Sequence, residues 1–137
     1  MTEDVWAFLK PRFLSNRPAQ FLSTCDGWAP LIKRMVDELD ALCLKELGKE
    51  GKECWEVLQC KEKFAELCFY FSFFRDMAGS LPEGFLKKFR EIVGRHEEES
   101  SRICEDCGKE GSQRSTGYWL VTRCDEHFQE VMKRHGS

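Results

Sequence analysis

Residues 103–128, ICEDCGKEGSQRSTGYWLVTRCDEHF, contain two closely spaced pairs of metal-ligand side chains. Cys104 and Cys107 form a C-x-x-C pair, and Cys124 and His127 form a C-x-x-H pair after sixteen intervening residues. Two ligands three residues apart can bind one ion from a single turn of the chain. The spacing therefore predicts a zinc site with these four side chains as its ligands.

The residues around the two pairs predict a small treble-clef or ribbon-like module. Gly108 gives the first pair the permissive backbone that a metal knuckle needs. The residues 118–122, YWLVT, have the composition of a strand, and Asp125 is a suitable N-cap for a helix that follows. We expect a knuckle, a short hairpin and a helix in that order. Because four protein ligands complete a tetrahedron, the zinc ion is expected to be structural and not catalytic.

Five further cysteines, at positions 25, 43, 54, 60 and 68, lie outside this motif. The first residues lack the basic-then-apolar order of a secretion signal, so we expect the reducing cytoplasm and free thiols. Cys60 and Cys68 could face one another across a hairpin, which leaves a cross-strand bridge as an alternative. Redox use of the Cys104–Cys107 pair is a second alternative, but it does not explain the distant C-x-x-H pair.

Composition limits the class of partner. The 137 residues carry a formal net charge of −3, and phosphate binding usually needs a surplus of cations on one face. No apolar run has the length that a membrane span requires. We therefore expect a protein partner, which could include further copies of this chain, and neither nucleic acid nor a membrane.

The longest amphipathic pattern runs from about residue 28 to residue 47 and predicts a helix. Pro30 is compatible with its first turn only, and Gly48 is expected to end it. Asp40 belongs to the charged face, which we expect to be solvated. The apolar face is formed by Trp28, Leu31, Ile32, Met35, Val36, Leu39, Leu42 and Cys43.

Residues 54–74, CWEVLQCKEKFAELCFYFSFF, predict an aromatic β-hairpin with a charged bend near residues 61–66. Phe69, Phe71 and Phe73 share one face, which we expect to pack on the long helix. Tyr70 and Phe74 share the other face. Because both faces are apolar, we expect the next helix or a second subunit to cover that outer face.

A second helical stripe follows residue 80 and continues to about Ser100, where it leads into the metal motif. Ser80 and Glu83 form a capping-box pattern at its start. The stripe includes His96, which we interpret as a core or boundary histidine in preference to a ligand or a base.

These elements predict an α+β fold in which a long amphipathic helix packs on the aromatic hairpin and a second helix leads to the zinc module. Residues 1–102 form the helical and hairpin core, and residues 103–137 form the zinc-binding lobe. The chain has no internal repeat or obvious flexible linker. We therefore expect one compact unit.

Three stretches together resemble a family of small uncharacterised bacterial and bacteriophage proteins, over roughly residues 25–128. They are DGWAPLIKRM, EVLQCKEKFAELCFYF and ICEDCGKEGSQRSTGYWLVTRCDEH. The family pairs a KEKFG-L-RFY-like hairpin with a terminal CxxCG...GW..T.CDEH zinc motif. Ala65 and Cys68 stand where the family more often has Gly and Arg. The resemblance implies the metal, the fold class and a bacterial or phage source, but no activity.

The sequence favours a zinc-stabilised, non-enzymatic protein-interaction module acting on a host or phage protein complex. The carboxylates at 97–99 resemble solvated surface, and no nucleophile, base and orienter form a set. An enzyme with an unrecognised site remains an alternative. A nucleic-acid-binding protein is another, for which the zinc lobe offers cations and stacking rings: Lys109, Arg114, Tyr118, Trp119 and Arg123.

Overall fold

The computed structural model describes residues 7, 9–12 and 26–135 of the chain. Most of the apolar residues of the N-terminal segment, Phe13, Leu14, Phe21 and Leu22, and also Cys25, lie outside the described residues. The elements in chain order are η1 (Lys10–Arg12), η4 (Asp26–Trp28), α2 (Ala29–Leu47), η5 (Gly51–Glu53), β1 (Trp55–Lys63), β2 (Glu66–Phe73), α3 (Arg75–Ala78), α4 (Phe85–Ser100), β3 (Ser112–Ser115), β4 (Leu120–Arg123) and α5 (Asp125–His135).

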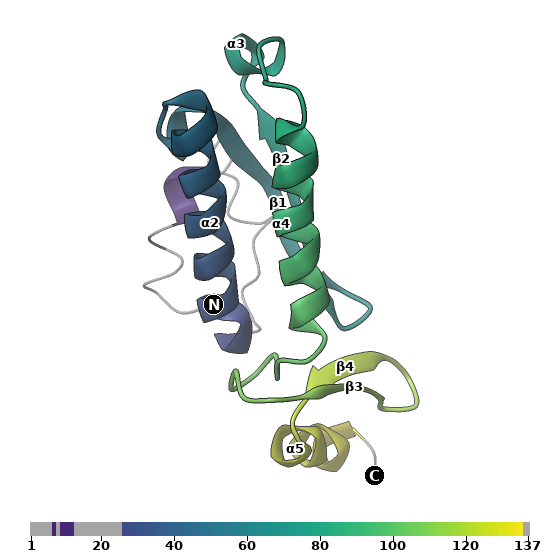
Figure 1. Ribbon diagram of the computed structural model, residues 1–137. Helices are drawn as coiled ribbons and strands as arrows, with labels where there is room; N and C mark the ends of the chain where they lie inside the picture. Colours follow the sequence, from purple (N-terminus) through teal and green to yellow (C-terminus); the bar gives the residue numbers. More distant parts are fainter. Residues whose placement is uncertain (1–6, 8, 13–25, 136–137) are drawn as a thin grey trace.

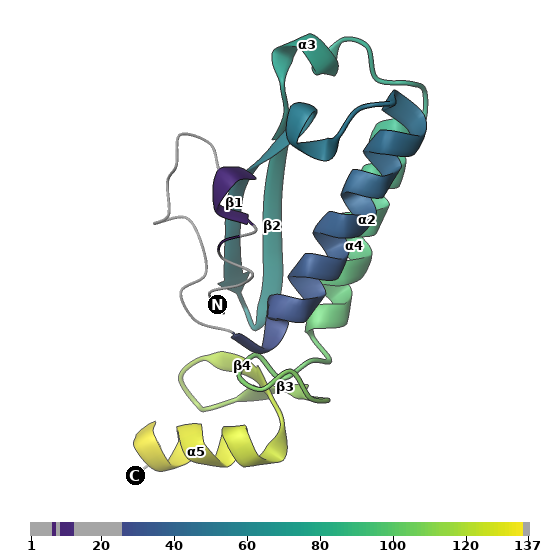
Figure 2. The same cartoon turned by 90° about the vertical axis from the view of Figure 1, so that its left-hand side faces the viewer.

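The predicted α+β fold is confirmed. Helices α2 and α4 lie side by side against the β1–β2 hairpin, and the β3–β4 hairpin and α5 form a separate module at one end (Figure 1). The second view shows that both long helices lie on the same side of the hairpin (Figure 2). The result is two layers, with the apolar core between the helices and the hairpin.

Helix α2 follows its sequence pattern closely. The residues of the predicted apolar stripe are buried except for half-buried Leu42, and Ala29 is buried in addition. Pro30 lies in the first turn. Gly48 takes the left-handed conformation at φ 69°, and its N–H donates to the carbonyl of Leu44. The predicted end of this helix is confirmed, because glycine adopts that conformation without the steric cost of a Cβ.

The start of α4 differs from the prediction. The helix begins at Phe85 after Gly84, which has φ 81° and provides no side-chain cap. The expected capping box of Ser80 and Glu83 does not form. Instead, the Ser80 hydroxyl donates to carbonyls of the short helix α3, including that of Met77. The glycine therefore sets the direction in which the chain enters α4.

The aromatic face of the hairpin also packs on α4, a contact that the sequence did not predict. Phe71 and Phe73 have ring centroids 4.6 and 4.9 Å from the ring of Phe89. Trp55, on β1, meets the same Phe89 ring at 5.3 Å and an interplanar angle of 77°. The inclined rings are the arrangement that aromatic quadrupoles favour. Phe89 therefore lies at the centre of an aromatic cluster.

A bulge between Val57 and Gln59 sets which side chains of β1 point inward. Cys60 then pairs with Phe69 and is buried, whereas Cys68 pairs with Lys61 and is half-buried. Neighbouring positions of a strand point to opposite faces, so the two thiols lie on opposite sides of the hairpin. This placement excludes the cross-strand disulfide that the sequence left open.

The helix that follows the hairpin does not cover its outer face, which corrects one of the two alternatives expected for this face. Tyr70 remains 44% exposed, and the Lys61 ammonium lies 5.6 Å from its ring. The cross-strand partners on this face are largely polar, for example Glu56 opposite Ser72. The polar side chains of β1 thus make the outer face of the hairpin amphipathic, although the sequence of β2 alone is apolar on both sides.

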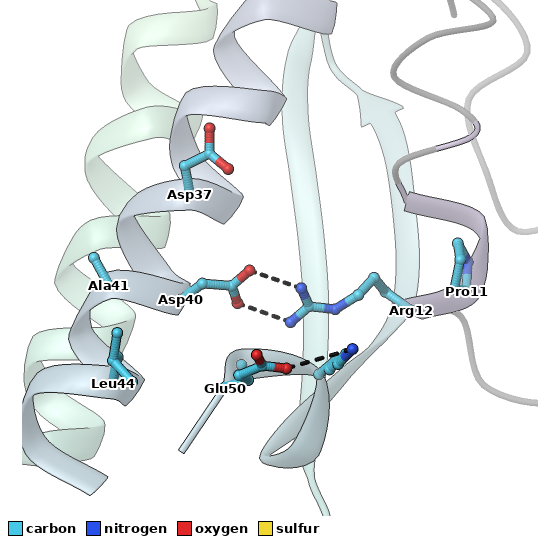
Figure 3. Close-up of a pocket in the computed structure, with 9 residues that line it drawn as sticks. Pro11, Arg12, Asp37, Asp40, Ala41, Leu44 and Glu50 are labelled. Carbon is cyan, nitrogen blue, oxygen red and sulfur yellow. Dashed lines mark hydrogen bonds and ion pairs between the residues drawn. The ribbon is translucent and has the colours of Figure 1, made fainter. Parts of the chain in front are cut away.

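Asp40 is also not simply solvated. Both of its oxygens accept hydrogen bonds from Arg12, at 2.7 and 2.8 Å, beside a recess of about 760 Å³ (Figure 3). Trp55 Nε1 donates to the same carboxylate at 3.1 Å, and the Arg12 guanidinium lies 4.5 Å from the Trp55 ring. A Cβ on Gly51 would lie 1.7 Å from Asp40 Oδ1, so a larger residue there would displace the paired side chains of Asp40 and Arg12. The ion pair joins the N-terminal segment to α2 and the hairpin.

No helix within the described residues is long and apolar enough to cross a membrane.

Candidate metal centre

Cys104 and Cys107 lie in a tight turn directly after an isolated bridge between Ile103 and Glu110. The Gly108 N–H donates to the carbonyl of Cys104 at 2.9 Å, and Gly108 has φ 80°. This left-handed residue lets the chain reverse, as predicted for a knuckle. Both thiols therefore come from one short loop that a backbone hydrogen bond closes.

The second pair lies where β4 ends and α5 begins. Cys124 follows the last residue of β4, and His127 lies in the first turn of α5. Asp125 is the first helical residue, and the Phe128 N–H donates to the Cys124 carbonyl at 2.9 Å. The order of knuckle, hairpin and helix is the one that the sequence predicts.

The four side chains converge, and they could hold one metal ion. Their ligand atoms all lie within 4.8 Å of one another. The Sγ atoms of Cys107 and Cys124 are 3.8 Å apart, and His127 Nδ1 lies 3.1 Å from Cys124 Sγ and 3.8 Å from Cys104 Sγ. A tetrahedron with metal–sulfur bonds of about 2.3 Å separates its sulfur atoms by about 3.8 Å. The spacing therefore fits four-coordinate binding.

His127 presents Nδ1 to the sulfur atoms and Nε2 to a carboxylate. Its Nε2 lies 3.1 Å from an oxygen of Asp106. A carboxylate on the outer ring nitrogen holds the proton there, which leaves Nδ1 free to bind a metal. Asp106, the residue before Cys107 in the knuckle, thus orients the ligand contributed by α5.

The local hydrogen bonds favour a thiolate at Cys124. The backbone N–H of His127 donates to its sulfur and, with further help from the neighbouring side chains, lowers the pKa of Cys124 to about 7. At Cys107 the Lys109 N–H also lowers the pKa, but burial and the thiols of Cys104 and Cys124 raise it more. The thiolate is the form that binds metals, so Cys124 is more readily available as a sulfur ligand than Cys107.

The knuckle is hydrogen-bonded to the residues directly before α2. The Gly27 N–H donates to the carbonyl of Glu105 at 2.9 Å, and Trp28 Nε1 donates to that of Ile103 at the same distance. A Cβ on Gly27 would lie only 2.0 Å from the Cys104 carbonyl oxygen and 2.5 Å from the Gly108 nitrogen. The two backbones can approach this closely only because residue 27 is glycine.

Sequence reasoning missed the supporting residues Asp106, Gly27 and Trp28. Asp106 had a detectable signal, because an acid beside a metal-binding cysteine is a common partner for a histidine ligand. Gly27 and Trp28 had none, since they lie 75 residues or more before the residues they contact in the chain.

His96, the other histidine considered from the sequence, does not belong to the metal centre. His96 is buried, its Nδ1 lies 2.7 Å from the Ile92 carbonyl, and its Nε2 lies 3.6 Å from Glu38. Among the described residues, the only other group with metal-ligand geometry is Asp106, His127 and Glu130, which shares His127 with the cysteine cluster.

No protein-family model, curated protein or solved structure matches this chain, and the function is therefore inferred from its own geometry.

Proposed function

We propose that the chain is a zinc-stabilised, non-enzymatic protein-interaction module of phage or bacterial origin that acts on a host or phage protein complex. The observation that carries the proposal is the closed ligand set, in which three sulfur atoms and one nitrogen converge with tetrahedral spacing. Two or more thiolates with imidazole select zinc over harder ions such as magnesium. With four protein ligands there is no open position for water or a substrate, so the zinc ion stabilises the fold.

A structural role fits the contacts of the knuckle. The turn that carries Cys104 and Cys107 also receives hydrogen bonds from Gly27 and Trp28 of the helical layer. Fixing the turn on a metal ion therefore also fixes the junction between the module and the core. Zinc would make the surface of the module rigid without taking part in a reaction.

Nucleic acid is the less favoured partner because two of its three candidate cations are already paired with carboxylates. Arg114 contacts Asp125, and Arg123 lies 3.1 Å from Glu105 and 3.8 Å from Asp106. Binding phosphate would require these ion pairs to break. The formal net charge of −3 adds a general repulsion.

A salt series with mixed-sequence DNA and RNA tests this choice. We expect no binding of nucleic acid by the zinc-loaded protein near physiological salt. Binding that weakens steeply with rising salt would contradict the proposal and favour the nucleic-acid alternative. Elemental analysis of protein purified without chelators checks the metal: we expect one zinc per chain, and less than about half an equivalent would contradict a structural role.

A further inference from the structure

The three cysteines of the candidate metal centre differ in their exposure to solvent. Cys104 is fully buried, Cys124 is half-buried and Cys107 is exposed. Among the residues that the structure describes, Cys107 is the one exposed cysteine. A small oxidant in solution therefore reaches the sulfur of Cys107 before that of any other described cysteine.

A second sulfur atom lies directly beside Cys107. The Sγ atoms of Cys107 and Cys124 are 3.8 Å apart. A disulfide has a sulfur–sulfur distance of about 2.05 Å, so each sulfur atom would move by roughly 1 Å to form the bond. An accessible thiol with a resolving thiol next to it is the usual arrangement in redox-sensing proteins. The geometry therefore suits oxidation of this pair to a disulfide.

Cys104 is a less suitable partner for Cys107, although the two form the C-x-x-C pair. Its side chain is fully buried. Its N–H donates to the Lys109 carbonyl at 2.7 Å, and its carbonyl accepts a hydrogen bond from the Gly108 N–H at 2.9 Å. The backbone on both sides of this side chain is thus held in the knuckle. Cys124, which is more accessible, is the better resolving residue.

The cysteines of the two-layer core are protected from the same reaction. Cys43, Cys54 and Cys60 are fully buried. Burial and the neighbouring Cys54 thiol raise the pKa of Cys43 to about 12, and burial also raises the pKa of Cys54. At half-buried Cys68, burial and then the Glu97 carboxylate raise the pKa. Because a protonated, buried thiol is a poor nucleophile, we expect oxidation to be confined to the module.

We propose that Cys107 and Cys124 form a peroxide-sensitive switch, in which their oxidation to a disulfide expels the zinc ion and unfolds the C-terminal module. The inference rests on the proposed function and adds to it a means of regulation. Both sulfur atoms are thiolates when they coordinate zinc, and the thiolate is the reactive form.

The reaction takes place in two steps. The Cys107 thiolate attacks one oxygen of hydrogen peroxide, so that the O–O bond breaks and a sulfenic acid and a hydroxide ion form. The Cys124 thiolate then attacks the sulfenic sulfur, which forms the S–S bond and expels a second hydroxide ion. The two sulfur atoms lose two electrons, and the peroxide gains them.

The disulfide leaves too few ligands for the metal. Only Cys104 and His127 remain, and two ligands do not complete the tetrahedron that zinc requires. The described part of the module has three buried apolar residues, and one of these is Cys104 itself. One disulfide holds two of the four ligand side chains and leaves the other two without the ion. The module should therefore unfold, and the hydrogen bonds from Gly27 and Trp28 to the knuckle should be lost.

The test uses the full chain loaded with zinc and freed of reductant. Elemental analysis comes first, because a chain without zinc rejects both the proposed function and the switch, whereas zinc that resists peroxide rejects the switch alone. Excess hydrogen peroxide is then added, and zinc release is followed with a chromogenic chelator. Far-UV circular dichroism reports the loss of helix, and tandem mass spectrometry of tryptic peptides identifies the disulfide.

Two variants are compared with the wild type. Cys107→His offers zinc a fourth ligand but removes the reactive sulfur, and it should release zinc at least about tenfold more slowly. Cys25→Ser with Cys68→Ser is the matched control. It removes a thiol outside the described residues and the half-buried thiol of the hairpin, and it should release zinc at the rate of the wild type.

We expect peroxide to release the zinc of the wild type, to form the disulfide between Cys107 and Cys124, and to lower the helical signal. Dithiothreitol with added zinc should reverse all three changes. If Cys107→His does not bind zinc, the disulfide found in the wild type decides the question. Retention of zinc, a disulfide that contains Cys104 or a core cysteine, or an unchanged helical signal after zinc release would overturn the proposal.

Discussion

The two-layer core and the C-terminal module are stabilised by different means. Among the described residues, the core contains nineteen buried apolar residues between positions 9 and 93. The described part of the module, residues 103–135, has three, and one of these is the candidate ligand Cys104. A core of the first size can sustain a fold by apolar burial, whereas a unit of the second size usually needs a metal or disulfides. The four candidate ligands accordingly all lie in the smaller part, which has too little apolar burial to be stable alone.

The contacts between the two parts show how they depend on each other. The module contributes the Ile103 and Glu105 carbonyls and the Thr122 hydroxyl, and the core contributes Trp28, Gly27 and the Ala65 carbonyl. These are polar contacts at two places, the start of α2 and the end of the hairpin. Changes in the module should therefore affect the ends of the core elements and leave the aromatic centre intact.

The largest effect is expected from the loss of a ligand. Structural zinc contributes on the order of 10 kcal/mol of apparent binding free energy in small modules, so Cys107→Ser should unfold the module. The core should keep its helices, as judged by far-UV circular dichroism. Cys68→Ser, which removes a thiol outside the cluster, is the control for the loss of a cysteine. An unchanged melting temperature of the Cys107→Ser variant would show that the site is not structural.

The second effect concerns the core. Phe89 is fully buried and contacts the rings of Trp55, Phe71 and Phe73. Phe89→Ala should lower the free energy of unfolding by about 3–5 kcal/mol, because it leaves a cavity at the centre of the aromatic cluster. Urea denaturation measures the change. A loss below about 1 kcal/mol would mean that the core does not depend on this cluster.

The third effect concerns the junction of the two parts. Gly27→Ala places a Cβ against the backbone of the knuckle and should cost about 1–3 kcal/mol, because backbone atoms on both sides must shift. Gly94→Ala is the matched control, since a Cβ there meets nothing within 4 Å and the position is helical. That variant should be stabilised by about 0.5–1 kcal/mol. If thermal melting shows the same change for both variants, the close contact at Gly27 is not formed.

The smallest effect is a stabilisation at the hairpin turn. Ala65 has φ 65°, a conformation that costs a residue with a Cβ about 1–2 kcal/mol. Ala65→Gly removes this cost, although glycine loses about 0.5–1 kcal/mol through the greater entropy of the unfolded chain. We expect a net gain of up to about 1 kcal/mol in the free energy of unfolding. A destabilised variant would indicate that the buried Cβ of Ala65 contributes more through packing than it costs in backbone strain.

Local patterns in the sequence predict much of this structure. The helix at 29–47, the hairpin and the order of elements around the metal ligands are each specified by residues close together in the chain. The same holds for the convergence of Cys104, Cys107, Cys124 and His127, because each pair belongs to a single turn.

Contacts between distant residues are what the sequence could not predict. Arg12 and Asp40 are 28 positions apart, and a charged residue on a helix face gives no sign of a partner beyond the helix. The packing of Phe71 and Phe73 on α4 depends on which helix covers the hairpin, and their spacing along one strand is compatible with either helix. The exposed outer face follows from the polar residues of β1 and becomes visible only once the register is known.

Hydrogen–deuterium exchange, measured with the zinc-loaded chain and again after chelation, compares the two parts in one experiment. We expect chelation to remove amide protection from residues 104–135, while the centres of α2 and β1, around Met35 and Val57, stay protected. Equal loss of protection in both parts, or none in the module, would contradict the central claim that a metal ion stabilises the C-terminal module and apolar burial stabilises the core.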